Sequence, residues 1–158
     1  MQPAALRETV DLSAYPDLIV MLLGLKVKRP RALLAMRDVG RGLAAIRRDP
    51  PDGLLANQNF LFGWNHVGIR QYWRDFESLE HFTRQAPHAV WWKSFLKDPR
   101  SCGFWHETYS ARGGIEAIYV EMPERTGLGT FAPIRTPVGR FMSSRDRLQD
   151  DAASRSGR

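Results

Sequence analysis

The feature that most constrains the fold is the run of six residues at 104–109, in which aromatic and polar side chains alternate. This alternation is typical of a β-strand, because successive side chains of a strand point to opposite faces of the sheet. Neither face resembles a solvent-facing surface, so both faces are expected to be covered. His106 and Glu107 then point apart, and the sequence predicts that Glu107 does not orient the imidazole of His106. Each must find another hydrogen-bond partner.

The rest of the chain supplies the layers that such a strand needs. Strands are predicted at 17–27, 54–62, 66–73, 103–109 and 115–122, with a helix between Pro30 and Asp49 and a second helical region, kinked at Pro87, over 75–98. The order β-α-β-β-α-β-β predicts a ferredoxin-like α+β fold, an antiparallel sheet with helices on one face. A second copy of the chain would cover the other face, which predicts a homodimer in the form of a dimeric α/β barrel.

The boundaries of this domain follow from composition. Residues 1–16 are expected to form an N-terminal arm, and residues 17–139 the ferredoxin-like barrel domain. Residues 140–158 are rich in Arg, Asp and Ser and lack apolar periodicity, so a disordered tail is expected there.

Charge and cysteine content narrow the function classes. The net charge of +6 is not accompanied by a nucleic-acid-binding motif, so it predicts a solvated basic surface and no nucleic-acid partner. The longest apolar run, Leu18–Leu25, is far shorter than the roughly 20 residues of a membrane helix, and no signal peptide is visible, so no membrane partner is expected. Cys102 as the single cysteine excludes an internal disulfide and fits a cytoplasmic protein.

Three segments carry a resemblance to a known family: Gln71–Leu79, Gly103–Tyr109, and Tyr119–Pro123 followed by Gly127–Leu128. Together they resemble the bacterial and fungal family typified by the fumagillin-pathway monooxygenase, which is similar in architecture to the antibiotic biosynthesis monooxygenases. The resemblance implies a dimeric α/β barrel. It also implies a cofactor-independent monooxygenase that uses O2 on a small apolar or aromatic metabolite.

His106 and His88 are the candidate bases. A buried neutral imidazole can remove a proton from a substrate when its pKa lies near the working pH. The alternative for His106 is a structural histidine, and for His88 a partly exposed helix residue. His88 or His106 could also ligate haem. The haem-degrading relatives carry their histidine near the end of the second helix, where this chain has Trp91 and Trp92.

The remaining candidates would bind the substrate or stabilise the anion that forms. Tyr109, Tyr72 and Asn59, the last expected to be buried, could donate hydrogen bonds to that anion. Trp73, Trp92 and Trp105 could line the pocket, although each could equally be a core residue. No metal-ligand spacing is apparent. Two other functions stay open: a haem-binding enzyme of the same barrel, and a non-catalytic ligand-binding or dimeric structural module.

Overall fold

The computed structural model describes residues 11–12, 14–30, 32–86, 88–97, 101–124, 131, 133–134 and 136–156. Its elements, in chain order, are β1 (Ile19–Val27), α1 (Ala32–Arg48), β2 (Leu54–Gly63), β3 (His66–Trp73), α2 (Phe76–Arg84), α3 (His88–Lys97), β4 (Cys102–Ser110), β5 (Ile115–Val120), a 3-10 helix (Gly139–Met142) and α4 (Ser144–Ser156). The first eight confirm the predicted α+β ferredoxin-like order, with the second helical region divided into α2 and α3. Residues 1–10 and 13 of the predicted arm, and Pro87 at the predicted kink, lie outside the described residues.

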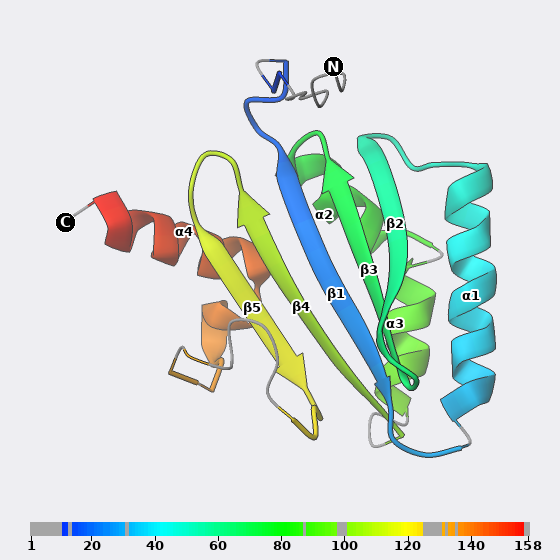
Figure 1. The fold of residues 1–158 in the computed structure, drawn as a ribbon. Coiled ribbons are helices and arrows are strands. Elements are labelled where there is room, and N and C mark those ends of the chain that lie inside the picture. Colours follow the sequence, from blue (N-terminus) through cyan, green and yellow to red (C-terminus); the bar gives the residue numbers. More distant parts are fainter. Residues whose placement is uncertain are drawn as a thin grey trace, which may run out of the picture.

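The five strands form one sheet in the order β2-β3-β1-β4-β5, and each neighbouring pair is antiparallel (Figure 1). The pairs β2–β3 and β4–β5 are joined by short turns, as the sequence predicts for hairpins. Because β1 pairs with β3 on one side and β4 on the other, the strand nearest the N-terminus occupies the middle of the sheet.

The hydrophobic core lies between the sheet and the helices on one of its faces. Figure 1 shows α2 and α3 behind the sheet. The core is built by β1, β3, α1 and α2 from Ile19, Met21, Ile46, Trp73, Leu79 and Phe82. Burying a side chain of this size contributes about 1.5–3 kcal/mol. In the antiparallel register Met21 pairs with Thr108, and Leu23 pairs with His106. Since directly paired residues share a face, His106 and Thr108 also point toward the helices.

Helix α2 begins where the sequence predicts a cap. The side chain of Asp75 accepts a hydrogen bond from the backbone N–H of Ser78 at 2.7 Å, which satisfies one of the free amide groups of the first turn. The same backbone hydrogen bond, acting against the effect of burial, lowers the pKa of the Asp75 carboxyl below its ordinary value. This cap fixes the direction in which the chain leaves β3 and crosses behind the sheet.

The predicted disorder of residues 140–158 is wrong for the part that the structure describes. Residues 139–142 form the 3-10 helix and residues 144–156 form α4, which packs beside β5 at the edge of the sheet (Figure 1). Helix α4 is held largely by polar contacts, and this explains why its sequence lacks apolar periodicity. Arg145 pairs with Glu80 of α2 at 2.6 Å, and Asp151 accepts the backbone N–H of Ile115 at 2.8 Å. The folded domain therefore extends beyond residue 139.

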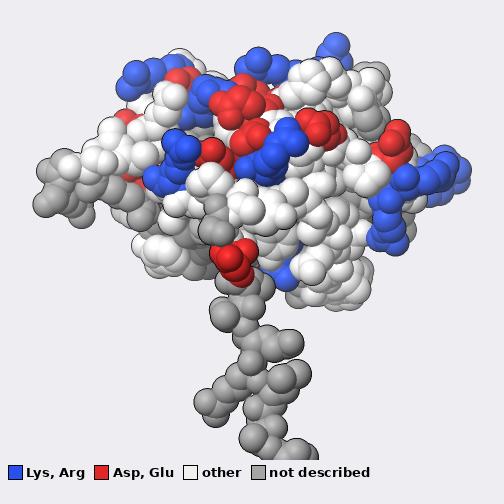
Figure 2. Space-filling view, turned by 90° about the horizontal axis from the view of Figure 1, so that it is seen from above, with Lys and Arg blue, Asp and Glu red and all other residues white. Residues whose placement is uncertain are grey.

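Charges of both signs are mixed on the surface seen from above. Figure 2 shows Lys and Arg side chains interspersed with Asp and Glu over this face. At the corresponding end of the sheet, Arg74 after β3 pairs with Asp52 at 2.9 Å, and Arg112 after β4 pairs with Asp17 before β1. These exposed pairs each contribute little to stability, because water screens their charges. Among the described residues, no helix is long and apolar enough to cross a membrane.

Candidate functional site

His106 of β4 forms a hydrogen-bonded pair with Glu116 of β5. The Nε2 atom of His106 lies 2.7 Å from Oε1 of Glu116. In the β4–β5 hairpin Thr108 is directly opposite Glu116, so Glu116 is the diagonal neighbour of His106 on the helix-covered face. The Glu116 side chain is 1% exposed and the His106 side chain 16% exposed. The carboxylate is thus inside the protein, while the imidazole reaches its surface.

Glu116 is held by three further side chains. Its Oε1 atom also accepts hydrogen bonds from the hydroxyls of Thr108 at 2.8 Å and Ser144 at 2.7 Å, and its Oε2 atom accepts Nε of Arg147 at 2.8 Å. Burial by itself raises the pKa of Glu116, but the hydrogen bond and charge of His106, with Ser144 and Arg147, outweigh it and lower the pKa to about 2. Glu116 is therefore a fixed carboxylate.

A carboxylate that accepts from Nε2 of a neutral imidazole places the proton on that nitrogen. The Nδ1 atom of His106 then carries the lone pair, and the part of the chain that the structure describes offers it no hydrogen-bond partner. A carboxylate that fixes the tautomer and orientation of a histidine is the arrangement used by general bases.

His88 of α3 lies near His106. Its Nδ1 atom is 3.1 Å from the carbonyl oxygen of Thr83, and its ring contacts those of Phe82 and Trp91. Burial lowers the pKa of His88, the hydrogen bond to Thr83 raises it in part, and the charge of nearby His106 lowers it again. The structure thus brings together the two predicted histidines, with His88 neutral near pH 7.

An aromatic ring contacts His106, and two further rings pack against that ring. Trp92 and Phe95 of α3 are stacked, with ring centroids 5.3 Å apart, and both contact Phe104 of β4. Phe104 in turn meets the His106 ring edge-on at 5.9 Å. Trp92 is 36% exposed, so the aromatic wall formed by Trp92, Phe95 and Phe104 is partly open to solvent. Exposed aromatic rings favour contact with a flat apolar molecule.

Three predicted site residues lie on the opposite face of the sheet. Tyr109 and Tyr72 both pair with Val20 of β1, one from each side, and Trp105 pairs with Gly24. The hydroxyl of Tyr109 donates to the buried carboxylate of Glu107, and burial followed by this bond raises the pKa of Tyr109. The sheet separates Tyr109 from His106, so the predicted use of both on one substrate does not fit a single chain.

The other two predictions fall on the helix-covered face but away from His106. Trp73 is fully buried in the core, where its indole N–H donates to Gln71 at 3.2 Å. Asn59 was expected to be buried, and this is wrong: it is exposed on the edge strand β2. Both positions are explained by the fold and do not indicate a binding site.

The structure also supplies residues that sequence reasoning missed. Glu116, Thr108, Ser144 and Arg147 all belong to the site through the hydrogen bonds above. The register of the predicted hairpin could have placed Glu116 opposite Thr108. Nothing in the sequence predicted the contribution of α4.

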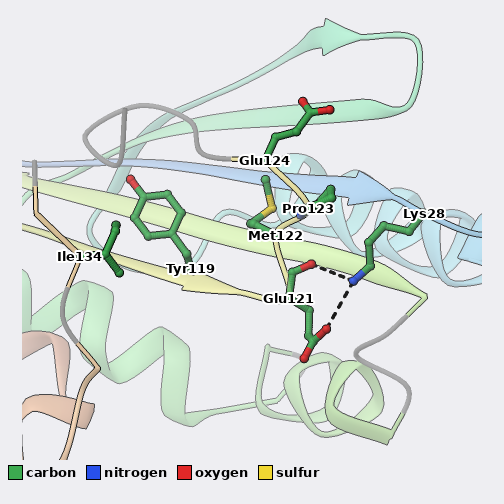
Figure 3. A pocket seen from close by; sticks show the side chains of 7 residues that line it. All are labelled: Lys28, Tyr119, Glu121, Met122, Pro123, Glu124 and Ile134. Carbon is green, nitrogen blue, oxygen red and sulfur yellow. Dashed lines mark hydrogen bonds and ion pairs between the residues drawn. The ribbon is translucent and has the colours of Figure 1, made fainter. Parts of the chain in front are cut away.

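A cavity of about 530 Å³ lies elsewhere. Figure 3 shows it where the chain leaves β5, lined by Lys28, Tyr119, Glu121, Met122, Pro123, Glu124 and Ile134. Lys28 donates to the carbonyl oxygen of Glu121 at 2.7 Å, and Tyr119 donates to Glu107 on the face away from the helices. Neither His88 nor His106 lines this cavity. It holds no imidazole, so we place the candidate site at the His106–Glu116 pair. Within the described residues no cluster of three metal-ligating side chains occurs.

The fold and the site together define an α+β domain of the ferredoxin-like class that has a His–Glu pair with a buried carboxylate on its helix-covered face. Two solved structures share the fold, each with a TM-score of 0.50. One is a conserved protein of Bacteroides thetaiotaomicron at 14% identity, covering 60% of this chain and 98% of that one. The other is protein SO0527 of Shewanella oneidensis at 12% identity, covering 65% and 94%.

The chain belongs to the family described as Monooxygenase af470-like, whose model matches residues 18–128, and this confirms the resemblance seen in the sequence. The aliphatic aldoxime dehydratase of Rhodococcus erythropolis is 30% identical over 107 residues, which cover 65% of this chain. That of Rhodococcus globerulus is 29% identical over 107 residues. The match spans 29% of the length of each of these two relatives. The family match ends before α4, which lies at Ser144–Ser156.

Proposed function

We propose that the protein is a cofactor-independent monooxygenase that acts on a small, flat, apolar or aromatic metabolite. The family supports the reaction class. The observation that carries the proposal is the 2.7 Å hydrogen bond between His106 and the buried carboxylate of Glu116.

In this reaction His106 acts as the general base. Its Nδ1 atom takes a proton from an electron-rich carbon or oxygen of the substrate, while Glu116 stabilises the imidazolium through Nε2. The resulting anion passes an electron to O2, and the two combine and take back the proton to give a hydroperoxide. Loss of water from the hydroperoxide leaves one oxygen atom on the substrate carbon as a carbonyl, so O2 is the oxidant and the second substrate. General base catalysis of this kind contributes about 10²–10⁴-fold to the rate.

The aromatic wall supports the substrate class. Phe104 meets the His106 ring, and Trp92 and Phe95 pack against Phe104. Rings of this kind favour a planar, apolar partner through stacking and apolar burial. Trp73, inside the core, takes no part in this binding, because it has no exposed surface.

One observation favours a second candidate, a haem-binding enzyme. His88 directs Nδ1 to the carbonyl of Thr83, which leaves Nε2 for another bond. Histidines that ligate metals commonly donate their other ring N–H to a carbonyl in this way. His88 would then hold the iron, and haem would supply the redox chemistry. His106 also has a ring nitrogen left for another bond, but that atom, Nδ1, is the base of the first candidate.

Oxygen uptake with quinol and polyene substrates tests the first candidate. His106→Ala is expected to lose at least about 100-fold in kcat/KM relative to the wild type. The matched control His81→Ala removes an exposed histidine of α2 that bonds Gln85 and should keep full activity. Equal activity of His106→Ala and the wild type would refute the assignment.

Titration with haem separates the other functions. A Soret band that is lost in His88→Ala and kept in His106→Ala would establish the haem-binding alternative. If added haem gives no Soret band and no substrate leads to oxygen uptake, the non-catalytic ligand-binding or structural role remains.

A further inference from the structure

Two residues of α4 reach the buried carboxylate of the candidate site. Ser144 donates to Oε1 of Glu116, while Nε and Nη2 of Arg147 each lie 2.8 Å from Oε2. The Nη1 atom of Arg147 donates to the carbonyl oxygen of Phe141 at 2.7 Å. The guanidinium is thus bonded on both sides, and its side chain is only 13% exposed. This is a buried, geometrically fixed ion pair.

The docking of α4 has other causes. Arg145 pairs with Glu80 and Glu77 of α2, Asp151 accepts the N–H of Ile115 at the free edge of β5, and Leu148 is buried. These contacts explain why a helix covers the edge strand. They do not explain why a second arginine is buried against Glu116, since a buried ion pair is seldom a gain in stability over apolar packing.

The positive charge of Arg147 balances the buried negative charge of Glu116. The carboxylate accepts three hydrogen bonds on Oε1, from His106, Thr108 and Ser144, but only His106 and Arg147 among its partners can carry a positive charge. Without Arg147 the buried negative charge would be balanced only by one more proton on the pair, which makes His106 an imidazolium ion or Glu116 a carboxylic acid. In the imidazolium ion Nδ1 of His106 already carries a proton, so it cannot accept one from the substrate.

We propose that Arg147 is a positioning residue of the His106–Glu116 pair: it supplies the counter-charge on Oε2 that holds Glu116 as a carboxylate with Oε1 turned toward His106. Helix α4, which lies outside the part of the chain matched by the family model, therefore completes the site. That Arg147 serves catalysis rests on the proposed function. That Arg147 holds Glu116 as a carboxylate does not.

The test is a pH titration of the Glu116 carboxyl carbon by ¹³C NMR on the full chain, with the signal assigned through Glu116→Gln. In the wild type the signal should remain that of a carboxylate down to about pH 2. In Arg147→Met the midpoint should rise by about 1–3 pH units, the usual effect of removing an adjacent opposite charge. Arg147→Lys keeps the charge and should restore most of the wild-type behaviour.

Arg145→Met is the matched control, because it removes an ion pair from the same helix without touching Glu116. Its midpoint should equal that of the wild type. An equal rise in Arg145→Met and Arg147→Met would show that Arg147 only docks the helix, and no rise in Arg147→Met would also overturn the proposal. If Arg147→Met does not fold, Arg147→Gln replaces it with the same expected outcomes.

The two proposals can fail separately. A raised midpoint in Arg147→Met together with no oxygen uptake by the wild type would retain the role of Arg147 and refute the oxygenase. Where oxygen uptake is found, the acid limb of kcat/KM should move upward in Arg147→Met and stay in place in Arg145→Met.

Discussion

The buried carboxylate of Glu116 makes a prediction about stability that needs no knowledge of the substrate. Its pKa is about 2 in the folded protein, against an ordinary value of 4.5. A group whose pKa is lowered by folding stabilises the fold above its unfolded pKa, and this contribution is lost as the pH falls through the folded pKa. A difference of about 2.5 units corresponds to about 3 kcal/mol of stability at pH 7.

The variant Glu116→Gln should lose this contribution and leave Arg147 without its buried counter-ion. Breaking such a pair costs about 3–5 kcal/mol at pH 7. Linkage predicts that about 2 kcal/mol of the wild-type contribution disappears between pH 7 and pH 3. The variant has no carboxyl to protonate at this position, so the difference in unfolding free energy between the two proteins should shrink by that amount.

Urea unfolding followed by tryptophan fluorescence at pH 7 and pH 3 measures this difference. The other carboxylates titrate in both proteins and cancel when the two are subtracted. Glu124→Gln is the control, because that side chain is 77% exposed and should change the stability by less than about 1 kcal/mol at either pH. A gap between wild type and Glu116→Gln that is the same at both pH values would refute the reasoning.

Two further predictions concern the packing at Gly24 and the oligomeric state. A methyl group added at Gly24 would clash with Nε1 of Trp105, so Gly24→Ala should lower the unfolding free energy by about 1–3 kcal/mol. Gly63→Ala, where no atom of the described residues lies within 4 Å of the added methyl group, should change it far less in the same urea assay. The predicted homodimer should appear as twice the chain mass in light scattering at micromolar concentration. Trp64 and Leu61 on the β2–β3 hairpin are 93% and 69% exposed, so Trp64→Ser should reduce the dimer fraction if this hairpin lies in the interface. A wild-type monomer would contradict the dimeric barrel.

The secondary-structure elements of this protein, and which residues of a strand share a face of the sheet, could be predicted from the local pattern of the sequence. The alternation of side chains in residues 104–109 was enough to predict that His106 and Glu107 point apart, and the structure confirms it: Glu107 meets Tyr109 and Tyr119, while His106 meets Glu116. Strand alternation and helix periodicity are properties of a few neighbouring residues, so they survive in the sequence alone. The predicted order of elements from β1 to β5 was correct for the same reason.

The partners of those side chains were decided by the tertiary structure. Asn59 is polar and lies within a strand, but it is exposed because sheet order places β2 at an edge. Residues 144–156 form a helix because their charged side chains meet Glu80, Glu116 and Ile115 only after the sheet has formed. Ser144 and Arg147 are 28 and 31 residues from Glu116 along the chain, a separation over which no local pattern predicts contact. The sequence by itself determined that His106 and Glu107 lie on opposite faces of the sheet. Only folding decided that His106 faces the helices and brought a carboxylate and an arginine to that face.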